Sequence, residues 1–362
     1  MKNIDYTIHV HKDINQDFIN SWQDLWQRSE NATLFNSYNW FKTNQATMDI
    51  KNYEVVTCFK DEKLIAVLPL YFTQKFGIKT ASSTGYKFIS TPFLFESYEP
   101  KLFKVLFDFL RQRGSFYLEK VHMDAVKILH DQYPDTLYSL ISVDPYLSKK
   151  KHPELINSDT NHKSTRKLLR KYTGRLRFAE YDQKDDLISY LHQMFELEQA
   201  SAKKQRKMDI FSSSSTKIFF ENIVKYCKSF VHINFLYLDN QPIAYTFNLS
   251  SKNTLFGYQT AYLSGKKSLS PGKMIMLHHS DSLKNSNFET YEMGGGISAY
   301  KLEFAPDYYY LYNIYYAKNP LIMLWWRSIN FARRMKQILF PLKNTRDHEF
   351  LFRVYPSLPK TA

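Results

Sequence analysis

Residues 232–244 read HINFLYLDNQPIA, and residues 53–66 read YEVVTCFKDEKLIA. Each stretch has β-branched and aromatic residues on both sides of a short polar pair, Asp239-Asn240 in one and Asp61-Glu62 in the other. Such runs, separated by a short polar turn, are typical of a β-hairpin. The two turns lie 178 positions apart, so the chain is predicted to contain the same hairpin twice.

A similar segment precedes each hairpin. Phe35-Asn36-Ser37 leads into Trp40-Phe41, and Phe211-Ser212-Ser213 leads into Ile218-Phe219-Phe220, which begins a run with helical spacing. A chain of 362 residues also exceeds the size at which a single core usually keeps growing. We therefore expect two related domains, with a boundary near residue 150 in the basic, proline-containing stretch 144–153.

Composition and charge limit the class of protein. Hydrophobic residues make up 44% of the chain and aromatic residues 17%, with only 10 Gly and 13 Pro, which indicates well-filled globular interiors. The net charge of +14 predicts anionic surroundings, such as cofactor phosphates, nucleic acid or an acidic lipid surface. No helix-turn-helix, zinc or RNA-binding motif accompanies the charge, so a dedicated nucleic-acid target is disfavoured.

Several features favour the cytoplasm. Residues 1–13 lack the basic-then-apolar pattern of a secretory signal, and the apolar run Pro320 to Trp326 is far shorter than the ~20 residues of a membrane span. Cys58 and Cys227 occur in unrelated contexts, which predicts reduced thiols. The histidines show no spacing typical of metal ligands, so we expect no metal.

The segment 255–285 has the pattern strand, polar loop, helix. The strand ends near Tyr262, and the helix begins after Ser270 at Pro271-Gly272, followed by Lys273 and Met274. A helix start leaves backbone N–H groups unpaired, and together with the helix dipole these can bind a phosphate. Taken alone, Pro-Gly more often marks an ordinary helix start; Lys266, Lys267 and Lys273 add positive charge nearby.

Three consecutive glycines, Gly294 to Gly296, follow Tyr291-Glu292-Met293. They are costly in backbone entropy, so a close backbone approach or an unusual turn is expected there. Lys301 lies just beyond them, where it could stabilise an oxyanion or bind a phosphate. A solvent-facing strand residue is an equally good interpretation of Lys301 from the pattern alone.

The ordered set 239–244, 257–262, 270–272, 291–295 and Tyr300-Lys301 resembles the FemAB-like branch of the GNAT superfamily of N-acyltransferases. The resemblance covers roughly residues 155–315 well and the first half loosely. It implies an α/β (α+β) fold of two tandem GNAT-like domains, each a mixed, mainly antiparallel sheet flanked by helices. We expect an N-terminal domain at 1–150 that shapes the acceptor site, a catalytic domain at 151–319, and a C-terminal helix and tail at 320–362.

The resemblance also implies an activity and a site. The enzyme would transfer an acyl group from acyl-CoA to an amine or hydroxyl of a cell-envelope or polysaccharide precursor. Lys301 matches the lysine of the family's Tyr/Phe-Lys motif, and Tyr300 and Glu292 are its expected catalytic partners. CoA binding is assigned to Ser270, Pro271, Gly272, Lys273 and Met274. Substrate binding is assigned to Tyr258, Gln259, Glu198, Lys203, Gly294 and Gly295.

The sequence departs from the family in two places. The family often has a Trp-Lys pair where residues 196–204 keep lysines and lack the tryptophan, and Glu292 stands where the family usually has Asp. Two alternatives therefore stay open: a Fem-type peptidyltransferase that uses aminoacyl-tRNA, and a catalytically silent scaffold of a membrane polysaccharide complex. The interval 187–235 is too short for the coiled-coil insertion of many tRNA-dependent enzymes, which favours CoA.

Two basic segments have surface character. Lys163, Lys167 and Lys171 would line one ridge of a helix over 162–171, either as a solvated face or as a contact for an anionic acceptor. Residues 320–343 form an amphipathic pattern with Leu321, Leu324 and Trp325 on one face and arginines on the other. Such a helix either packs on the domain or lies in an anionic membrane interface, as a peripheral contact at the inner face.

Overall fold

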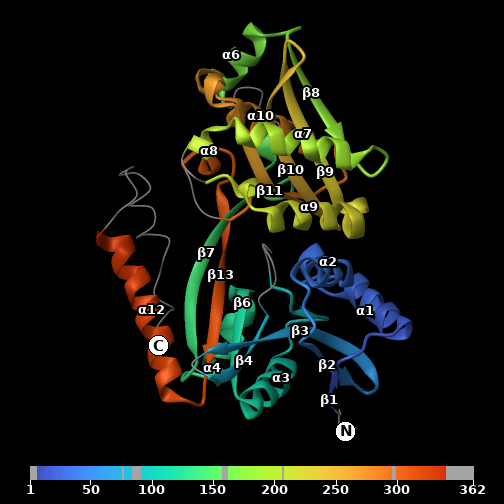
Figure 1. Cartoon of the computed structure of the whole chain (residues 1–362), viewed down its shortest axis with the longest axis vertical. Helices are drawn as coiled ribbons and strands as arrows, with labels where there is room; N and C mark the ends of the chain where they lie inside the picture. The colour runs from blue at the N-terminus through green and yellow to red at the C-terminus, as the bar shows by residue number, and fades with distance from the viewer. Residues whose placement is uncertain are drawn as a thin grey trace.

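The structure, a computed structural model, describes residues 6–75, 77–83, 91–156, 162–205, 208–295 and 299–339. Figure 1 shows two lobes, one above the other, with the long strands β7 (Leu137–Ser148) and β13 (Asp307–Tyr316) reaching from one to the other. Most of the lower lobe comes from the first half of the chain and most of the upper lobe from the second.

The other elements follow one another in a repeated order. In the first half they are β1 (Tyr6–His11), α1 (Gln16–Arg28), the 3₁₀ helix η1 (Leu34–Asn36), α2 (Tyr38–Met48), β2 (Tyr53–Lys60), β3 (Lys63–Lys75), β4 (Ile78–Ser82), β5 (Leu94–Phe95), α3 (Pro100–Arg113), β6 (Ser115–His122) and α4 (Met123–Gln132). In the second half they are α5 (Pro153–Ile156), α6 (Lys163–Lys171), β8 (Leu176–Tyr181), α7 (Leu187–Gln199), α8 (Ala202–Gln205), η2 (Ile210–Ser212), α9 (Ser214–Cys227), η3 (Lys228–Phe230), β9 (Val231–Leu238), β10 (Gln241–Ser251), β11 (Thr254–Tyr262), η4 (Ser264–Leu269), α10 (Pro271–Leu283), β12 (Thr290–Glu292), α11 (Ala299–Leu302) and α12 (Pro320–Leu339).

Both predicted hairpins are present. β2 pairs antiparallel with β3, and β9 pairs antiparallel with β10. In each turn both polar residues, Asp61-Glu62 and Asp239-Asn240, have positive φ angles between 48° and 68°. Two successive left-handed residues match the right-handed twist of the flanking strands, which explains why Asp and Asn occupy these turns.

The strands of both halves join in one sheet of 13 strands among the described residues, in the order β1-β2-β3-β4-β6-β13-β7-β12-β11-β10-β9-β8, with β5 on the edge of β3. Corresponding elements stand at equal distances from the two ends of this order: β1 with β8, β2 with β9, β3 with β10, β4 with β11, and β6 with β12. The mixed, mainly antiparallel sheets flanked by helices that the resemblance implied are confirmed, and the sheet order has approximate two-fold symmetry.

The central strands are exchanged between the halves. β7, the last strand of the first half, pairs with β12, whereas β13, the last strand of the second half, pairs with β6. β7 and β13 also pair with each other along most of their lengths. Although the boundary at residue 319 assigns β13 to the second domain, its partner β6 belongs to the first half, so the division into domains stays a prediction.

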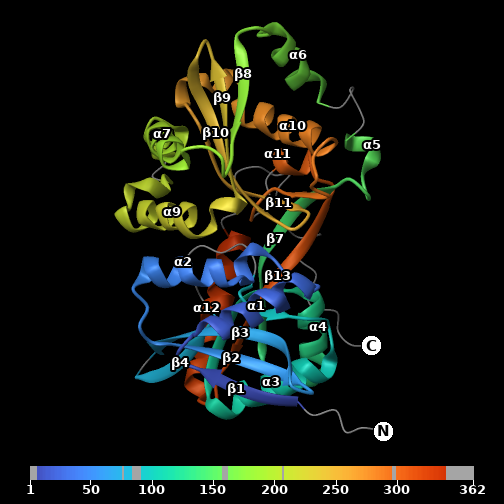
Figure 2. The same cartoon turned by 90° about the vertical axis from the view of Figure 1, so that its right-hand side faces the viewer.

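Helices α2 and α9, the counterparts of each other, lie side by side where the lobes meet (Figure 2). One apolar cluster spans both halves there: Leu34, Phe35 and Trp40 pack with buried residues of α7, α9 and β9 to β11. Trp40 and Phe219 make an edge-to-face contact with ring centroids 5.6 Å apart. The lobes therefore share a core.

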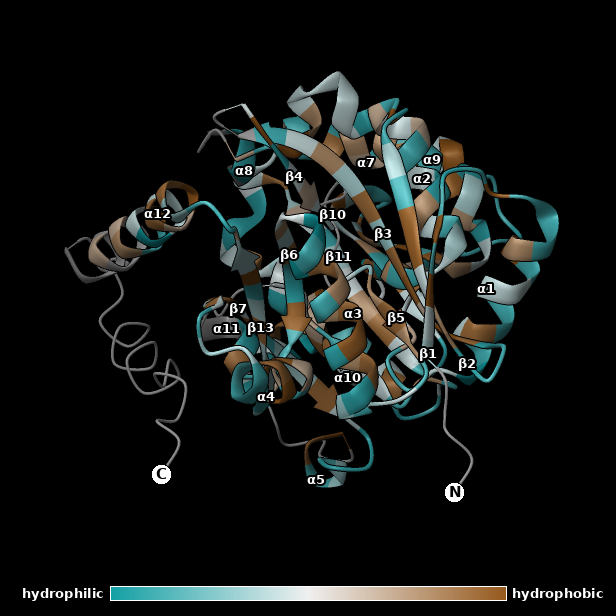
Figure 3. Cartoon of the chain, turned by 90° about the horizontal axis from the view of Figure 1, so that it is seen from below, coloured by the Kyte–Doolittle hydropathy of each residue, from teal (hydrophilic) through white to brown (hydrophobic). Residues whose placement is uncertain are grey.

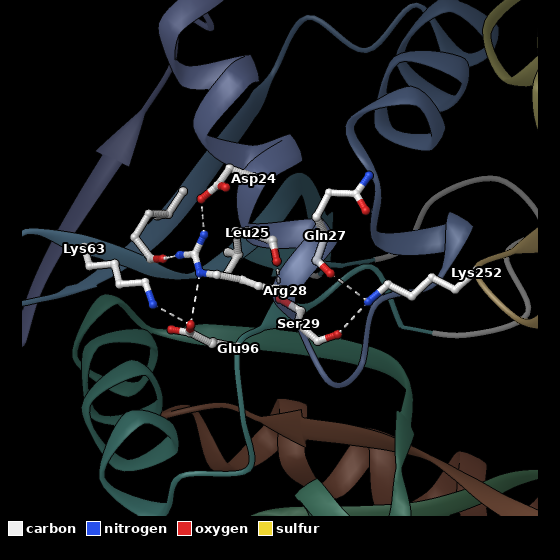
Figure 4. A network of polar contacts seen from close by, with 9 residues as sticks. Asp24, Leu25, Gln27, Arg28, Ser29, Lys63, Glu96 and Lys252 are labelled. Atoms are coloured by element: carbon white, nitrogen blue, oxygen red, sulfur yellow. Dashed lines mark hydrogen bonds and ion pairs between the residues drawn. The ribbon is translucent and has the colours of Figure 1, made fainter.

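A polar network also ties the lobes together (Figure 4). Lys252, in the turn between β10 and β11, donates to the backbone carbonyls of Gln27 (3.2 Å) and Ser29 (2.9 Å) at the end of α1. A lysine at a helix C-terminus satisfies carbonyls that have no partner inside the helix. Arg28 beside them bonds Asp24 and Glu96, and with Lys63 it holds the pKa of Glu96 below its usual value against the effect of burial.

Helix α12 packs on the lower lobe with one face. Ile322 and Trp326 are buried against Tyr315, and Asn330 accepts a hydrogen bond from the Ser139 hydroxyl at 2.9 Å. Its outer face leaves Leu321, Leu324 and Phe331 more than half exposed. Within the described residues no helix combines the length and apolar character needed to cross a membrane.

Candidate active site

Strands β11 and β12 run parallel but stay paired only over Thr254–Phe256 and Thr290–Glu292. Beyond this point β11 continues to Tyr262. The segment that follows β12 turns away from β11 at Gly294, whose φ is +74°. A Cβ on Gly294 would stand 2.4 Å from the carbonyl oxygen of Gly257. The first of the three predicted glycines thus permits a close approach of two strands, at the point where they separate.

The opening between the strands coincides with a bulge in β11. Gln259 lies opposite Phe247 and Gly257 opposite Asn248, so Tyr258 is an extra residue in the ladder. Bulges interrupt regular pairing and re-aim side chains, and they are common beside active sites. Tyr258 packs against Phe35 and Trp40 of the first half.

Lys301 lies next to the same opening. It lies in the short helix α11, and its Nζ donates to the carbonyls of Gly294 and Gly295, each at 3.0 Å. Burial lowers the pKa of Lys301 to about 8, opposed by the charge of Asp144 and assisted by that of Lys203. An ammonium group with this pKa can hold or release a proton near neutral pH.

Glu292, the last residue of β12, is the second titratable group of the opening. Burial raises its pKa to about 8, and Asp144 adds to the increase, whereas a hydrogen bond from the Tyr309 hydroxyl opposes it. Asp144 itself is 1% exposed and accepts a hydrogen bond from the Ser142 hydroxyl. A carboxyl group with a pKa near 8 is suited to accept a proton from an amine.

Glu198 links α7 to strands β10 and β11 beside the opening. The carboxylate is fully buried on α7 and accepts hydrogen bonds from the Tyr245 hydroxyl, the Gln259 amide and the backbone N–H of Ile210. Such a saturated buried carboxylate orients its neighbours. Lys203 lies near Glu198, and burial lowers its pKa against the attraction of that carboxylate.

The predicted phosphate site is the start of α10. Ser270 has a left-handed backbone with φ 52°, and Pro271 is the first helical residue. The N–H groups of Lys273 and Met274 donate to the Ser270 carbonyl, at 3.0 and 3.2 Å, and the Met274 side chain is buried. The Lys273 ammonium pairs with Glu303 at 2.6 Å, two residues beyond Lys301. This contact places the helix start beside α11.

The structure thus brings together most of the residues that the sequence assigned to the site: Glu198, Lys203, Gln259, Glu292, Gly294, Gly295 and Lys301, with Tyr258 at the edge that faces the first half. The Tyr300 side chain lies outside the described residues. Sequence reasoning missed Asp144 and Tyr309. Asp144 precedes a proline in a stretch interpreted as a linker. Tyr309 lies in the tyrosine run 308–310, and the sequence signals its role only in that neighbouring residues of a strand point to opposite faces of the sheet.

Among the described residues, no three His, Cys, Asp or Glu side chains are grouped so as to hold a metal ion. Cys58 and Cys227 are both free and buried, and burial raises the pKa of each thiol to about 12. These thiols are therefore poor nucleophiles. The chemistry of the described site falls to lysine and carboxyl groups.

Residues 159–302 match the acetyltransferase (GNAT) domain family. This segment is a GNAT-family domain. It contains the strand opening, the start of α10 and Lys301, so the site described above lies within a GNAT acyltransferase domain. The recognition drawn from the sequence motifs is confirmed.

Solved structures share the fold of this acyltransferase over most of its length. FemX is 11% identical and has a TM-score of 0.59, covering 87% of this chain and 99% of its own. The C-terminal domain of a protein described as a lysylphosphatidylglycerol synthetase, from Agrobacterium fabrum, is 10% identical with a TM-score of 0.53, covering 82% and 90%. A protein of unknown function from Bacteroides thetaiotaomicron is 8% identical with a TM-score of 0.55, covering 85% and 99%. A search of the curated proteins found no match.

Proposed function

We propose that this acyltransferase moves an acyl group from acyl-CoA to an amine, or a hydroxyl, of a cell-envelope or polysaccharide precursor. The observation that carries the proposal is that Glu292 and Lys301, each with a pKa of about 8 and each acted on by the charge of Asp144, both lie next to the point where β11 and β12 separate: Glu292 ends the paired stretch, and Lys301 bonds Gly294 and Gly295 just beyond it. Perturbed titratable groups that converge at a strand opening favour acid-base chemistry over a silent scaffold.

The reaction follows from these two groups. The acceptor amine attacks the thioester carbonyl, so that a carbon–nitrogen bond forms and the carbon–sulfur bond breaks. Glu292 takes the amine proton, the Lys301 ammonium stabilises the oxyanion that develops on the carbonyl, and the CoA thiolate leaves and is protonated by solvent. Gly294 and Gly295 position Lys301 through their carbonyls.

The donor that we propose is acyl-CoA. Acyl-CoA would place its phosphates at Ser270 to Lys273, beside Lys266 and Lys267, and Lys273 would exchange Glu303 for a phosphate. Aminoacyl-tRNA is the alternative, favoured by the names of FemX and the lysylphosphatidylglycerol synthetase domain among the similar folds. The interval 187–235 is too short for the coiled-coil insertion of many tRNA-dependent enzymes, which favours CoA.

We further propose that the enzyme works at the cytoplasmic face of a membrane and contacts it through α12. Figure 3 shows this helix at the edge of the molecule. Leu321, Leu324 and Phe331 are 71%, 60% and 65% exposed, and Arg327 is exposed beside them. An apolar stripe edged by positive charge suits an anionic lipid interface.

Sedimentation with anionic liposomes tests the membrane contact. We expect the full chain to bind, and Leu321→Ser/Leu324→Ser/Phe331→Ser to bind much less. These three side chains are exposed, so the variant should unfold at the same temperature. Equal sedimentation of both proteins would remove this part of the proposal.

Thermal-shift measurements test the donor. We expect acetyl-CoA or a longer acyl-CoA to raise the melting temperature, with free CoA giving a smaller rise. Lys273→Ala should reduce the shift, because it removes a positive charge from the phosphate site. No stabilisation by any of these thioesters would count against acyl-CoA and leave aminoacyl-tRNA as the donor to test.

A further inference from the structure

The site draws on residues outside the GNAT-family segment. Asp144 on β7 and Tyr309 on β13 lie on either side of residues 159–302 in the sequence, and they are direct partners in the antiparallel pairing of the two strands. Partners in such a pairing hold their side chains on the same face of the sheet. The exchange of β7 and β13 between the halves therefore brings a carboxylate and a phenol together.

The same face of the sheet carries Glu292. This residue is the partner of Tyr146 in the pairing of β12 with β7, and Tyr146 lies two residues along the strand from Asp144. Side chains two residues apart on a strand point to the same face, and diagonal neighbours on adjacent strands are within reach of long side chains. Glu292, Asp144 and Tyr309 thus form one cluster over three adjacent strands, β12, β7 and β13.

Tyr309 holds the Glu292 carboxyl directly, because its hydroxyl donates to Glu292 Oε2. Burial and the charges of Glu292 and Asp144 raise the pKa of the Tyr309 phenol well above its ordinary value, so the phenol keeps its proton. A donor to a carboxylate favours the ionised form. The hydrogen bond therefore fixes the carboxyl in place and opposes the effect of burial on its pKa.

Asp144 lies against the turn that holds Lys301. A Cβ on Gly295 would stand 3.7 Å and 3.9 Å from the two carboxylate oxygens of Asp144, and the Gly295 carbonyl accepts from Lys301 Nζ at 3.0 Å. Asp144 is buried, so solvent ions screen its charge only weakly. That charge favours the ammonium form of Lys301 and the neutral form of Glu292.

Other titratable groups face the cluster from neighbouring elements: Tyr146 of β7, Asp307 of β13, His122 and Lys120 of β6, and Lys203 of α8. Lys203 opposes Asp144 in its effect on Lys301, because a second cation disfavours the ammonium form. Asp144 acts on both reacting groups, and it raises the pKa of each.

We infer that Asp144 and Tyr309 are positioning residues for the acyl transfer: Tyr309 fixes the Glu292 carboxyl in place, and the Asp144 charge keeps Lys301 an ammonium and makes Glu292 a stronger base. This inference rests on the proposed function. Because both residues lie outside 159–302, the GNAT-family segment depends on the two strands that flank it in the sequence.

The two residues should shift the pH profile of kcat/KM in different ways. Asp144→Asn removes the shared negative charge, so both limbs should move to lower pH, by about one pH unit. Tyr309→Phe removes the donor to the ionised carboxyl, so the acid limb alone should move, to higher pH by about one pH unit. The maximum for Tyr309→Phe should then fall about fourfold, because fewer molecules hold Glu292 ionised and Lys301 protonated at once.

Carbon-13 NMR of the resting protein, labelled at the Glu Cδ and the Lys Cε, follows the same two groups without any substrate. The signals of Glu292 and Lys301 are identified by their loss in Glu292→Gln and Lys301→Arg. We expect Asp144→Asn to move both titrations to lower pH, and Tyr309→Phe to move the Glu292 titration alone to higher pH. A merely structural role would lower stability without shifting the Glu292 titration in opposite directions in the two variants.

Each variant has a matched control. Asp49→Asn removes the same charge from a side chain that is 85% exposed, and Tyr308→Phe removes a hydroxyl from the neighbour of Tyr309 that points to the other face of the sheet. Both controls should titrate as the wild type does. Unmoved titrations in Asp144→Asn would overturn the role of Asp144, and a Glu292 titration that is unmoved or lowered in Tyr309→Phe would overturn that of Tyr309.

The outcome is separable from that of the proposed function. Shifted titrations in a protein that transfers no acyl group from any donor would keep the effect of Asp144 and Tyr309 on the two groups and reject the acyl transfer. Acyl transfer with unmoved titrations in both variants would keep the transfer and reject the positioning roles.

Discussion

Glu292 and Lys301 titrate in the same range, and this determines how the rate should depend on pH. Glu292 acts as a base only when ionised, which requires a pH above its pKa of about 8. Lys301 stabilises the oxyanion only when protonated, which requires a pH below its own pKa of about 8. We therefore predict a bell-shaped profile of kcat/KM with a maximum near pH 8, falling about tenfold per unit on each side.

Two variants separate the limbs of that profile. Lys301→Arg keeps its charge at high pH, so the alkaline decline should disappear, whereas Glu292→Gln should lower the rate and remove the acid limb. An alkaline decline that persists in Lys301→Arg would assign that limb to another group. An acid limb that persists in Glu292→Gln would assign it to the acceptor amine.

Gly294 and Gly295 offer a matched pair for the strand opening. A methyl group on Gly294 would stand 2.4 Å from the Gly257 carbonyl oxygen, in a backbone with φ +74°, so Gly294→Ala should lower the free energy of unfolding by about 2–4 kcal/mol. A methyl group on Gly295 would meet its nearest neighbour, the Ser142 hydroxyl, at 3.5 Å. Chemical denaturation should therefore find Gly295→Ala close to the wild type, and equal losses would contradict the role of Gly294.

At the same scale, the sequence pointed to some site residues and not to others. Lys301 and the glycines stand out because lysine after a glycine run is uncommon and the family motif includes it. Asp144 and Tyr309 did not stand out, because they reach the site only through the pairing of β7 with β13, which joins residues far apart in the sequence.

At the scale of elements, Lys252 connects the turn after β10 with the end of α1. Lys252→Met keeps the apolar part of the side chain and removes the ammonium that donates to the carbonyls of Gln27 and Ser29. The free energy of unfolding should fall by about 1 kcal/mol, a small loss because water competes for this partly exposed group. Lys51→Met is the control, since Lys51 and its partner Asp49 are both 85% exposed. Urea denaturation that gave the same small change for both variants would show that the contact contributes nothing.

Elements with local signals were predictable. The two hairpins followed from their polar turns and the start of α10 from Pro271. The exchange of β7 and β13 had no local signal, because a strand pairs equally well with either neighbour, and the choice depends on the arrangement of the whole sheet.

At the scale of the whole molecule, the repeat detected in the hairpins extends to a sheet with approximate two-fold symmetry. Both halves contain a short parallel pairing, Thr80–Ser82 with Ser115–Tyr117 and Thr254–Phe256 with Thr290–Glu292, and a small residue, Ser83 or Gly257, follows the first strand of each pair. The halves differ in the titratable residues that follow these pairings: Glu292 and Lys301 in the second half, and Glu119 and Lys120 in the first.

The central claim is that acyl transfer takes place at the opening of the second half and depends on Lys301. It is tested most directly by measuring CoA release from acetyl-CoA with amine-bearing envelope and polysaccharide precursors as acceptors. We predict that Lys301→Ala lowers kcat by about 100-fold or more, whereas Lys273→Ala raises KM for acetyl-CoA and leaves kcat near that of the wild type. Unchanged kcat in Lys301→Ala would contradict the claim.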